Sequence, residues 1–252
     1  MGKNCEQFRS RLTSKQKLVG TFLKTPSPIV AEVLSYSKLD VFCIDVEHAP
    51  FGRLELDLCI SAFRAADRPS IVRVADDSPT SIRNALDSGA TGIVVPHVST
   101  AEQAARIVKA AHFGEGGRGF AGSTRAANFT TKRMPDHIGD SARETAVIVQ
   151  IEDLSALANV SAIAAVDGVD AIFIGRADLA VAMSESPMDS EVVETVRRIC
   201  SDAQNVDAAV GMFTPDFSEI PDWIDRGCSF FLLSSDQSLM LAGANDLAKV
   251  ID

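Results

Sequence analysis

The sequence predicts a (β/α)8 barrel, the fold also called a TIM barrel. Eight short apolar runs of β-strand character alternate with eight segments of helical character within 252 residues, and eight such pairs in about 250 residues are typical of this fold. An open doubly wound sheet is the alternative, but it would need fewer strands and a glycine-rich turn after the first strand, which the sequence lacks. With 46% hydrophobic and 23% charged residues, the chain can fill one large core. We therefore expect a single domain over residues 1–252.

The expected strands and helices follow one another in strict alternation. Strands are expected at residues 18–23, 40–46, 70–74, 91–96, 146–151, 170–174, 208–213 and 229–234. Helices are expected at residues 28–37, 53–66, 79–88, 100–112, 153–165, 190–205, 215–226 and 237–250. Capping residues support these bounds, because Ser78-Pro79 opens a helix and Arg226-Gly227 closes one.

Two stretches fall outside this alternation. Residues 1–17 are polar and are expected to form an N-terminal extension. The segment 113–145 is far longer than an ordinary connection, and we expect it to be a loop over the C-terminal face, where such loops cover a site. Its Arg118 and Arg125 could attract an anionic substrate or could lie on a solvated surface. The glycine-rich stretch at 114–119 is interpreted as a turn, since it follows a helix and lacks the Gly-Lys-Ser/Thr ending of a phosphate loop.

Charge and cysteine content limit the possible partners. The 24 basic and 34 acidic residues give a net charge of −10, which argues against a nucleic-acid or anionic-membrane surface and favours a small-molecule partner. The five cysteines are an odd number without a CxxC pair, so neither a disulfide framework nor a zinc site is expected. The first residues lack the apolar core of a signal peptide, and no apolar run approaches the ~20 residues of a membrane span. We therefore expect a soluble, cytoplasmic protein with reduced thiols.

The unit at residues 146–182 brings two carboxylates together. Its two strands flank a helix and must be parallel, so Glu152 and Asp178 lie at the same carboxyl edge of the sheet. Parallel neighbours are about 4.8 Å apart, and two carboxylates that close would repel each other unless a hard divalent cation binds them. A pair of solvated loop acids or strand-end caps is the alternative. Gln150 shares the parity of Glu152 and points the same way from the strand.

Other strand ends supply groups for proton abstraction beside a carbonyl. His48 follows the second strand, Arg73 ends the third and His97 follows the fourth, and catalytic groups come from these ends in TIM barrels. A cation on Glu152 and Asp178 could chelate a 2-oxo acid and stabilise its enolate. His48 could then move the proton, and Arg73 could stabilise the developing oxyanion. A single histidine at a strand end is nevertheless often structural.

Five motifs carry a family resemblance: FCIDVEHAP at 42–50, VRV at 72–74, ALDSGA at 85–90, VQIE at 149–152 and FIGRADL at 173–179. In order and spacing they resemble the HpcH/HpaI family of metal-dependent class II pyruvate aldolases, over about residues 18–241. The resemblance implies a (β/α)8 barrel, usually a hexamer in which paired subunits exchange the last helix. It therefore implies a homo-oligomer, a hexamer or a trimer of dimers.

The resemblance also implies roles for individual residues. The implied metal ligands are Glu152 and Asp178, with Mg, Mn or Co as the metal. The implied catalytic groups are His48, Arg73 and Asp87, the last as the partner that orients His48 and holds its charge. The implied substrate-binding groups are Gln150, Gly175, Ala177 and Phe22. Supporting or structural roles remain open for Asp45, Glu47 and His97.

The chain departs from the family pattern at Arg176, where Gly-Arg-Ala-Asp replaces the common Gly-Pro-Ala-Asp. An inward Arg176 would add an anion-binding charge close to the metal, whereas an outward Arg176 would be a surface residue. We favour the outward orientation, because an uncompensated guanidinium beside a cation would weaken metal binding. No lysine is expected at the site, so an imine mechanism is not expected either.

The predicted function is that of a lyase, a class II aldolase. It would reversibly cleave a 4-hydroxy-2-oxo acid to pyruvate, or a related 2-oxo acid, and an aldehyde through a metal-stabilised enolate. One alternative is a citrate-lyase-like carbon–carbon lyase acting on acyl-CoA esters, and another is a non-catalytic barrel that binds a metabolite.

Overall fold

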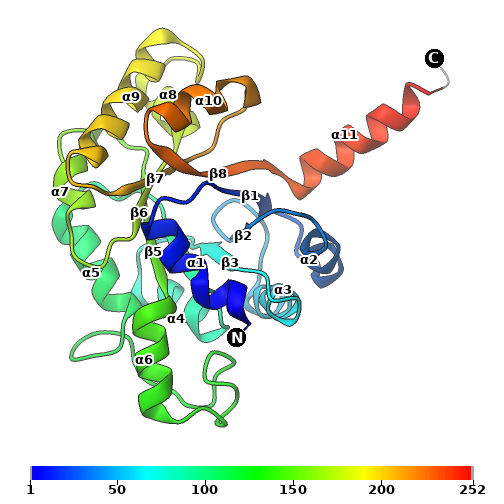
Figure 1. The fold of residues 1–252 in the computed structure, drawn as a ribbon, viewed down its shortest axis with the longest axis vertical. Coiled ribbons are helices and arrows are strands. Elements are labelled where there is room, and N and C mark those ends of the chain that lie inside the picture. Colours follow the sequence, from blue (N-terminus) through cyan, green and yellow to red (C-terminus); the bar gives the residue numbers. More distant parts are fainter. Residues whose placement is uncertain (1, 251–252) are drawn as a thin grey trace.

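The computed structural model describes residues 2–250, which form a closed barrel of eight parallel strands surrounded by helices (Figure 1). Neighbours in sequence pair with each other, and β8 pairs with β1 to close the barrel. The strands are β1 (Leu18–Leu23), β2 (Val41–Asp45), β3 (Ser70–Arg73), β4 (Gly92–Val95), β5 (Ala146–Ile151), β6 (Ala171–Ile174), β7 (Ala209–Met212) and β8 (Cys228–Ser235). The predicted (β/α)8 barrel is confirmed, and all eight strands lie where the apolar runs predicted them.

Eight helices correspond to the predicted helical segments. They are α2 (Pro28–Ser35), α3 (Arg53–Ala65), α4 (Pro79–Asp87), α5 (Ala101–Ala111), α7 (Val160–Ala164), α9 (Ser190–Gln204), α10 (Ile220–Asp225) and α11 (Asp236–Ala248). Short 3-10 helices precede two of them, η1 (Leu154–Ala156) before α7 and η2 (Phe217–Glu219) before α10. Three helices were not predicted: α1 (Lys3–Thr13), α6 (Met134–Glu144) and α8 (Arg176–Met183).

Alternation along each strand divides the apolar side chains into two layers. In β2, Val41 and Cys43 belong to the cluster inside the barrel, whereas Phe42 and Ile44 belong to the layer beneath the helices. All strands run the same way, so their carboxyl ends form one rim. A polar residue that continues the inward parity at this rim therefore faces the open end of the barrel.

Helix α1 closes the opposite, amino end of the barrel. Its buried residues are Cys5, Phe8 and Leu12, and the ring of Phe8 packs edge to face on Phe230 of β8, with the ring centroids 6.4 Å apart. One buried stripe is enough to dock an otherwise polar helix. The polar extension at residues 1–17 is thus in large part a helix that completes the core.

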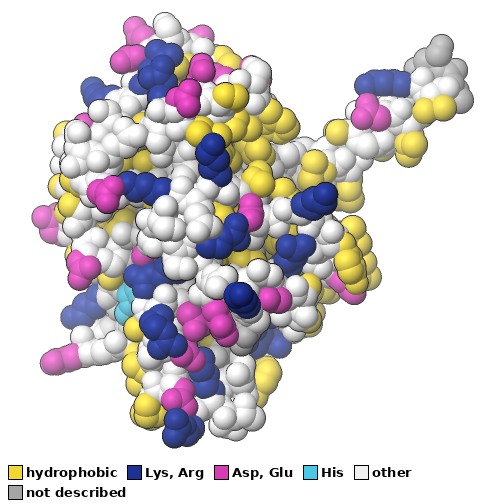
Figure 2. All heavy atoms as spheres, in the orientation of Figure 1, with side chains coloured by type: hydrophobic (Ala, Val, Ile, Leu, Met, Phe, Trp, Pro, Cys, Tyr) yellow, Lys and Arg dark blue, Asp and Glu magenta, His cyan; other side chains and the backbone are white. Residues whose placement is uncertain are grey.

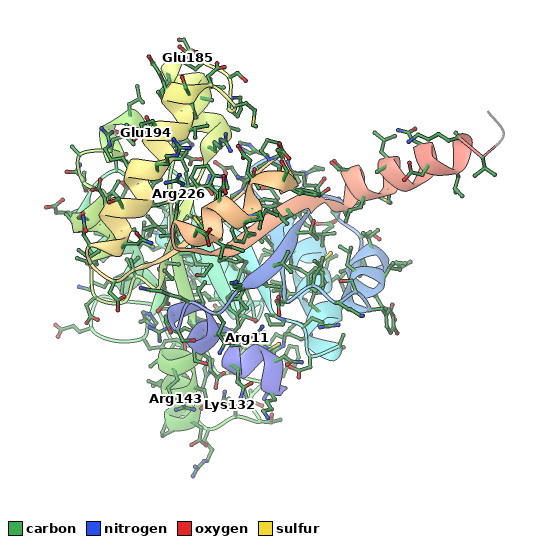
Figure 3. All side chains as sticks on the ribbon, turned by 45° about the horizontal axis from the view of Figure 1, so that its top comes forward. Arg11, Lys132, Arg143, Glu185, Glu194 and Arg226 are labelled. Atoms are coloured by element: carbon green, nitrogen blue, oxygen red, sulfur yellow. The ribbon has the colours of Figure 1, made fainter. Side chains whose placement is uncertain are left out.

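The segment 113–145 lies at the amino end of the barrel, so the expectation of a loop over the C-terminal face is wrong. It joins the end of α5 to the start of β5, and such a connection meets the strands at their amino ends. It contains α6, which packs beside α1, where the Arg9 guanidinium donates to the carbonyl of Ala142 at 2.5 Å. Arg11, Lys132 and Arg143 mark this end of the molecule (Figure 3).

Helix α11 extends away from the barrel (Figure 1). Apolar side chains lie along it (Figure 2), among them the exposed Leu239, Met240, Leu241, Leu247 and Val250. A helix with so much exposed apolar surface is typical of an interaction site. Within residues 2–250, no helix combines the length and the apolar character needed to cross a bilayer.

Candidate active site

The carboxyl rim of the barrel surrounds an open cavity. The residues that line it are Phe22, Lys24, His48, Arg73, Gln150, Phe173, Gly175, Arg176, Ala177, Asp178, Phe213, Ser234, Ser235 and Ser238. Seven of the nine predicted site residues belong to this lining. Of the other two, Glu152 lies beside the cavity, whereas Asp87 lies away from it at the end of α4.

Arg73 is buried at the rim and is held by two carboxylates. Its Nε and Nη2 donate to the two oxygens of Asp45 at 3.0 and 2.8 Å, and its Nε lies 3.2 Å from a carboxylate oxygen of Glu47. Burial by itself would lower the pKa of Arg73, but the hydrogen bonds that Arg73 donates to Asp45 outweigh it and raise that pKa above its ordinary value. Its guanidinium also lies 5.0 Å from the ring centre of Phe22. Arg73 is therefore a fixed, permanently charged donor on the cavity wall.

His48 follows β2 and reaches into the same cavity with a side chain that is 54% exposed. Its backbone N–H donates to Asp45 at 3.2 Å, and its Nε2 lies 3.7 Å from Glu47. The ring is thus free to contact a bound molecule, while its backbone is tied to the carboxylate that also holds Arg73.

Asp87 does not reach His48 within the chain. It is the last residue of α4, and helices that follow strands in this fold end at the amino side of the barrel. There it accepts hydrogen bonds from Nε and Nη2 of Arg118 at 3.2 and 2.5 Å. Within one chain, the expectation that Asp87 orients His48 is therefore wrong. The carboxylate that binds the backbone of His48 is that of Asp45.

Glu152 follows β5 and is almost fully buried. One of its oxygens accepts the backbone N–H of His97 at 2.8 Å, and the other accepts the side-chain amide of Gln150. Burial raises the pKa of Glu152 above its ordinary value, and the negative charge of Asp178 adds to the rise. A carboxylate in this position is stabilised by a nearby positive charge.

Gly175 follows β6 and places its backbone against Glu152. A Cβ at this position would lie 2.6 Å from Oε2 of Glu152 and 3.2 Å from the amide nitrogen of Gln150. Only glycine therefore allows the chain to approach this carboxylate so closely. Helix α8 begins at the next residue and carries the exposed Asp178 in its first turn, so both predicted metal ligands belong to one rim.

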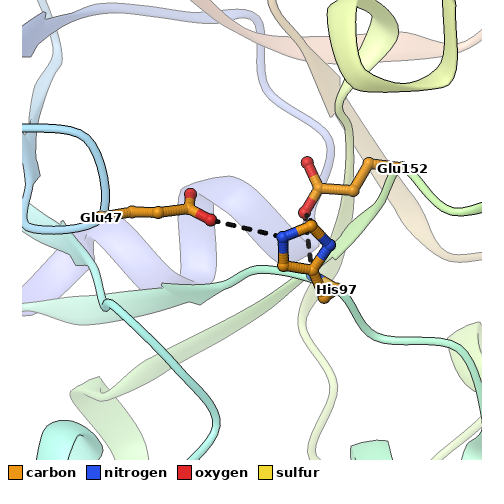
Figure 4. A group of neighbouring side chains, drawn as sticks. All are labelled: Glu47, His97 and Glu152. Atoms are coloured by element: carbon orange, nitrogen blue, oxygen red, sulfur yellow. Dashed lines mark hydrogen bonds and ion pairs between the residues drawn. The ribbon is translucent and has the colours of Figure 1, made fainter. Parts of the chain in front are cut away.

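The donors around Glu152 suit a hard divalent cation. The Oε1 atom of Gln150 is buried and has no hydrogen-bond partner among the described residues, and carboxylate and amide oxygens are the ligands that such cations prefer. The structure also gathers a second group on the other side of Glu152, formed by Glu47, His97 and Glu152 (Figure 4). The His97 ring lies 3.4 Å from Glu152 through Nδ1 and 3.6 Å from Glu47 through Nε2. Glu152 is thus common to both candidate ligand sets.

The sequence left the role of His97 open. The structure places its ring between the carboxylates of Glu47 and Glu152. Its backbone has φ 56°, a conformation uncommon for a residue with a side chain. Burial lowers the pKa of His97, but the charges of Glu152, Asp153 and Glu47 outweigh it and raise that pKa above its ordinary value. No sequence pattern indicates this arrangement, because it depends on a single backbone conformation after β4.

Arg176 is neither a surface residue nor an inward anion-binding group, so the favoured outward orientation is wrong. Its side chain is 1% exposed, and its Nη1 lies 2.6 Å from Glu219. Its Nε donates to the carbonyl of Pro187 at 2.5 Å, and its guanidinium lies 5.7 Å from the ring centre of Trp223. We expected Arg176 to point into solvent because its positive charge would oppose metal binding. Glu219 instead compensates that charge inside the protein.

Arg118 and Arg125 lie at the amino end of the barrel, away from this cavity. Arg118 is buried against Asp87, and Arg125 donates to both oxygens of Asp57 at 3.1 and 2.5 Å. Neither of the two sequence-based alternatives, an anion site or a solvated surface, describes Arg118. Its guanidinium is a structural cation paired with a carboxylate from α4.

Lys24 lines the cavity, so the expectation that no lysine lies at the site is wrong. It follows β1 directly and lies 3.3 Å from Asp45 through its Nζ. Its position at the carboxyl end of a predicted strand indicated a place on the rim, but the residues around it carry no recognisable motif.

Comparisons with known proteins agree with this architecture. A family model described as HpcH/HpaI aldolase/citrate lyase matches residues 18–242. A 5-keto-4-deoxy-D-glucarate aldolase of Salmonella arizonae is 34% identical over 245 residues, which cover 96% of this chain and 95% of that protein.

Two crystal structures are similar in sequence and fold. An HpcH/HpaI aldolase/citrate lyase family protein from Burkholderia cenocepacia has a TM-score of 0.92 and 31% identity, covering 98% of this chain and 99% of its own. An HpcH/HpaI aldolase from Desulfitobacterium hafniense has a TM-score of 0.89 and 26% identity, covering 97% of this chain and 96% of its own.

Proposed function

Because the chain belongs to the HpcH/HpaI aldolase/citrate lyase family, we propose that it reversibly cleaves a 4-hydroxy-2-oxo acid to pyruvate, or a related 2-oxo acid, and an aldehyde. The protein is an aldolase, and so a carbon–carbon lyase. The observation that carries the proposal is the cavity that Asp178, His48 and Arg73 line together, with Glu152 against its lining residue Gly175. A metabolite-binding barrel would not require a base and a permanent cation beside a pair of carboxylates.

The proposed metal ligands are Glu152 and Asp178, with Mg, Mn or Co as the ion. The amide oxygen of Gln150 is buried and has no hydrogen-bond partner within residues 2–250, which supports a cation here. When bound, the metal would act as a Lewis acid that lowers the energy of the enolate of the 2-oxo acid. The backbone amides of Gly175 and Ala177 are proposed to receive the carboxylate of the same substrate.

His48 is the proposed acid–base group. Its half-exposed ring lines the cavity, and imidazole is the side chain best suited to exchange protons near neutral pH. In the cleavage direction it would take the proton from the 4-hydroxyl as the C3–C4 bond breaks, and it would return a proton to C3. Arg73 would stabilise the oxygen that becomes negative, because Asp45 and Glu47 hold it in place. Phe22 would form the wall against which the substrate packs.

We also propose how the protein assembles and where in the cell it is located. The exposed apolar side chains of α11 support a homo-oligomer, and the family resemblance favours a hexamer, or a trimer of dimers. The five cysteines, all free and buried, support a cytoplasmic location. An acyl-CoA lyase is the weaker alternative, since two of the three cationic side chains lining the cavity already pair closely with carboxylates.

Proton exchange of pyruvate in deuterium oxide tests this function without knowledge of the aldehyde. With added Mn²⁺ the protein should replace the methyl protons of pyruvate, as followed by NMR, and EDTA should abolish the exchange. His48→Ala should slow it by about 10²-fold or more, whereas His112→Ala, at the amino end of the barrel, should leave it unchanged. Exchange that persists in EDTA, or borohydride trapping of pyruvate on Lys24 as an imine, would show that a different mechanism operates.

A further inference from the structure

Helix α8 carries the proposed metal ligand Asp178 and is held to the barrel by few side chains. It has eight residues, and isolated helices of this length are marginally stable in water. Its buried residues are Arg176, Leu179 and Ala180, and Arg176 is the largest fully buried side chain among the described residues. Asp178 is exposed, so packing around its own side chain does not fix its place at the cavity. The position of Asp178 therefore depends on how α8 is anchored.

Arg176 joins the start of α8 to two other segments. Its Nε donates to the carbonyl of Pro187 at 2.5 Å, in the stretch that follows the end of α8. Its Nη1 and Nη2 lie 2.6 and 3.4 Å from the two carboxylate oxygens of Glu219, which belongs to η2. A guanidinium is planar and holds its donors in a fixed fork, so these contacts fix direction as well as distance. One side chain thus ties both ends of α8 to the connection between β7 and α10.

The Glu219 carboxylate is itself held by buried residues near the rim. Its Oε2 accepts hydrogen bonds from Oγ1 of Thr214 at 2.9 Å and from Nε1 of Trp223 at 3.3 Å. Thr214 follows β7 and is fully buried, and Trp223 is buried in α10. Arg176 is therefore anchored to a well-packed part of the barrel.

The anchor acts against a repulsion between the two proposed ligands. Asp178 lies in the first turn of α8, and Gly175, at the start of that turn, lies against Glu152. Two carboxylates brought to one place repel each other when no cation lies between them. A short helix that was free to shift would relieve this repulsion by moving Asp178 away. A cation would then bind more weakly, in proportion to the fraction of molecules in which Asp178 is in place.

We propose that Arg176 is a positioning residue for metal binding, because its anchorage on Glu219 holds α8, and with it Asp178, in place. Arg176 itself contacts neither the cation nor the substrate in this role. The proposal rests on the proposed function, and in particular on Glu152 and Asp178 as the ligand pair.

Mn²⁺ binding to the metal-free protein tests this role without turnover. Calorimetry should show that Arg176→Met weakens Mn²⁺ binding by about 10-fold or more, the usual cost of losing a group that supports a ligand. Glu219→Gln, which removes the charge of the anchor and keeps its shape, should weaken binding in the same direction. Arg9→Met is the control for stability, since it takes the partner from the buried Asp170 at the amino end of the barrel. It should also destabilise the fold, but should leave the Mn²⁺ affinity unchanged.

Hydrogen exchange followed by mass spectrometry measures the mobility of α8 directly. Exchange of the α8 amides should be faster in Arg176→Met than in Arg9→Met. Unchanged Mn²⁺ affinity in both Arg176→Met and Glu219→Gln, or an equal loss of affinity in Arg9→Met, would overturn the proposal. If Arg176→Met weakens Mn²⁺ binding but the unmutated protein does not exchange the protons of pyruvate, the proposed function fails and the role of Arg176 stands.

Discussion

Asp45 and Arg73 are register partners on the neighbouring strands β2 and β3, and their side chains form a two-pronged ion pair at the rim of the barrel. The pairing follows from strand parity, which turns both residues into the open end of the barrel. Arg73 thereby becomes a positioned cation, and Asp45 becomes the residue through which Arg73, His48 and Lys24 are joined.

Asp45→Asn should destabilise the fold by about 3 kcal/mol at neutral pH, because it leaves a buried guanidinium without its main partner. Urea unfolding followed by circular dichroism measures this change. Asp57→Asn is the matched control: it removes a similar pair with Arg125, in which the carboxylate is 30% exposed, and should cost about 1 kcal/mol or less. Equal losses in the two variants would mean that Glu47 can replace Asp45 as the partner of Arg73.

Metal titration decides between the two ligand sets that share Glu152. Glu152→Ala and Asp178→Ala should each weaken Mn²⁺ binding by at least about 10-fold, since even residues that only support ligands cost that much. His48→Ala and His97→Ala should change it far less. If His97→Ala weakens binding as much as Glu152→Ala while Asp178→Ala does not, the ion lies between Glu47, His97 and Glu152, and the proposed roles are wrong.

Gly175→Ala should weaken Mn²⁺ binding at least about 10-fold without changing the backbone path. The φ and ψ angles of Gly175 are −83° and 72°, so alanine is free of the penalty of a left-handed conformation. Its methyl group would nevertheless lie 2.6 Å from Oε2 of Glu152 and would displace that carboxylate. Gly119→Ala, where nothing lies within 4 Å of the new Cβ, is the control. Unchanged affinity in Gly175→Ala would show that the Glu152 position is not critical for the ion.

The barrel could be predicted from the sequence because each of its strands is a short buried apolar run bounded by polar residues. The positions of Glu152 and Asp178 followed from the strand–helix–strand order alone, since parallel strands share their carboxyl edge. The helices α1 and α6 could not be predicted in the same way. Each docks through only a few buried residues, and their polar faces made the segments resemble an extension and a loop.

Contacts between distant residues were beyond sequence reasoning. Arg118 and Asp87 are 31 residues apart, and Arg176 and Glu219 are 43 apart. Whether such a cation is paired, exposed or directed at a ligand depends on the folded positions of both partners. For the same reason Lys24 was missed, although its place at a strand end was visible.

Arg176→Met should destabilise the protein by about 3 kcal/mol at pH 7, because Glu219 loses the cation that compensates its charge. Burial raises the pKa of Glu219, but hydrogen bonds from Arg176, Trp223 and Thr214 lower it by more, so that it lies below its ordinary value. The stabilisation is therefore present above the unfolded-state pKa of about 4.3 and is lost as the pH falls through the lower folded-state pKa. Urea unfolding at a series of pH values should therefore show that the difference in the free energy of unfolding between Arg176→Met and the unmutated protein becomes smaller as the pH falls below about 4.3.

Arg197→Met is the control for Arg176→Met, since its exposed pair with Glu194 should contribute no more than about 0.5 kcal/mol. Aldehyde preference provides a second readout. Because the guanidinium is bound to Glu219 and to the carbonyl of Pro187, Arg176→Met should leave the ratio of the kcat/KM values for 4-oxobutanoate and pentanal in aldol addition to pyruvate unchanged. A selective loss with 4-oxobutanoate at unchanged stability would place Arg176 among the substrate-binding groups and would contradict the buried ion pair.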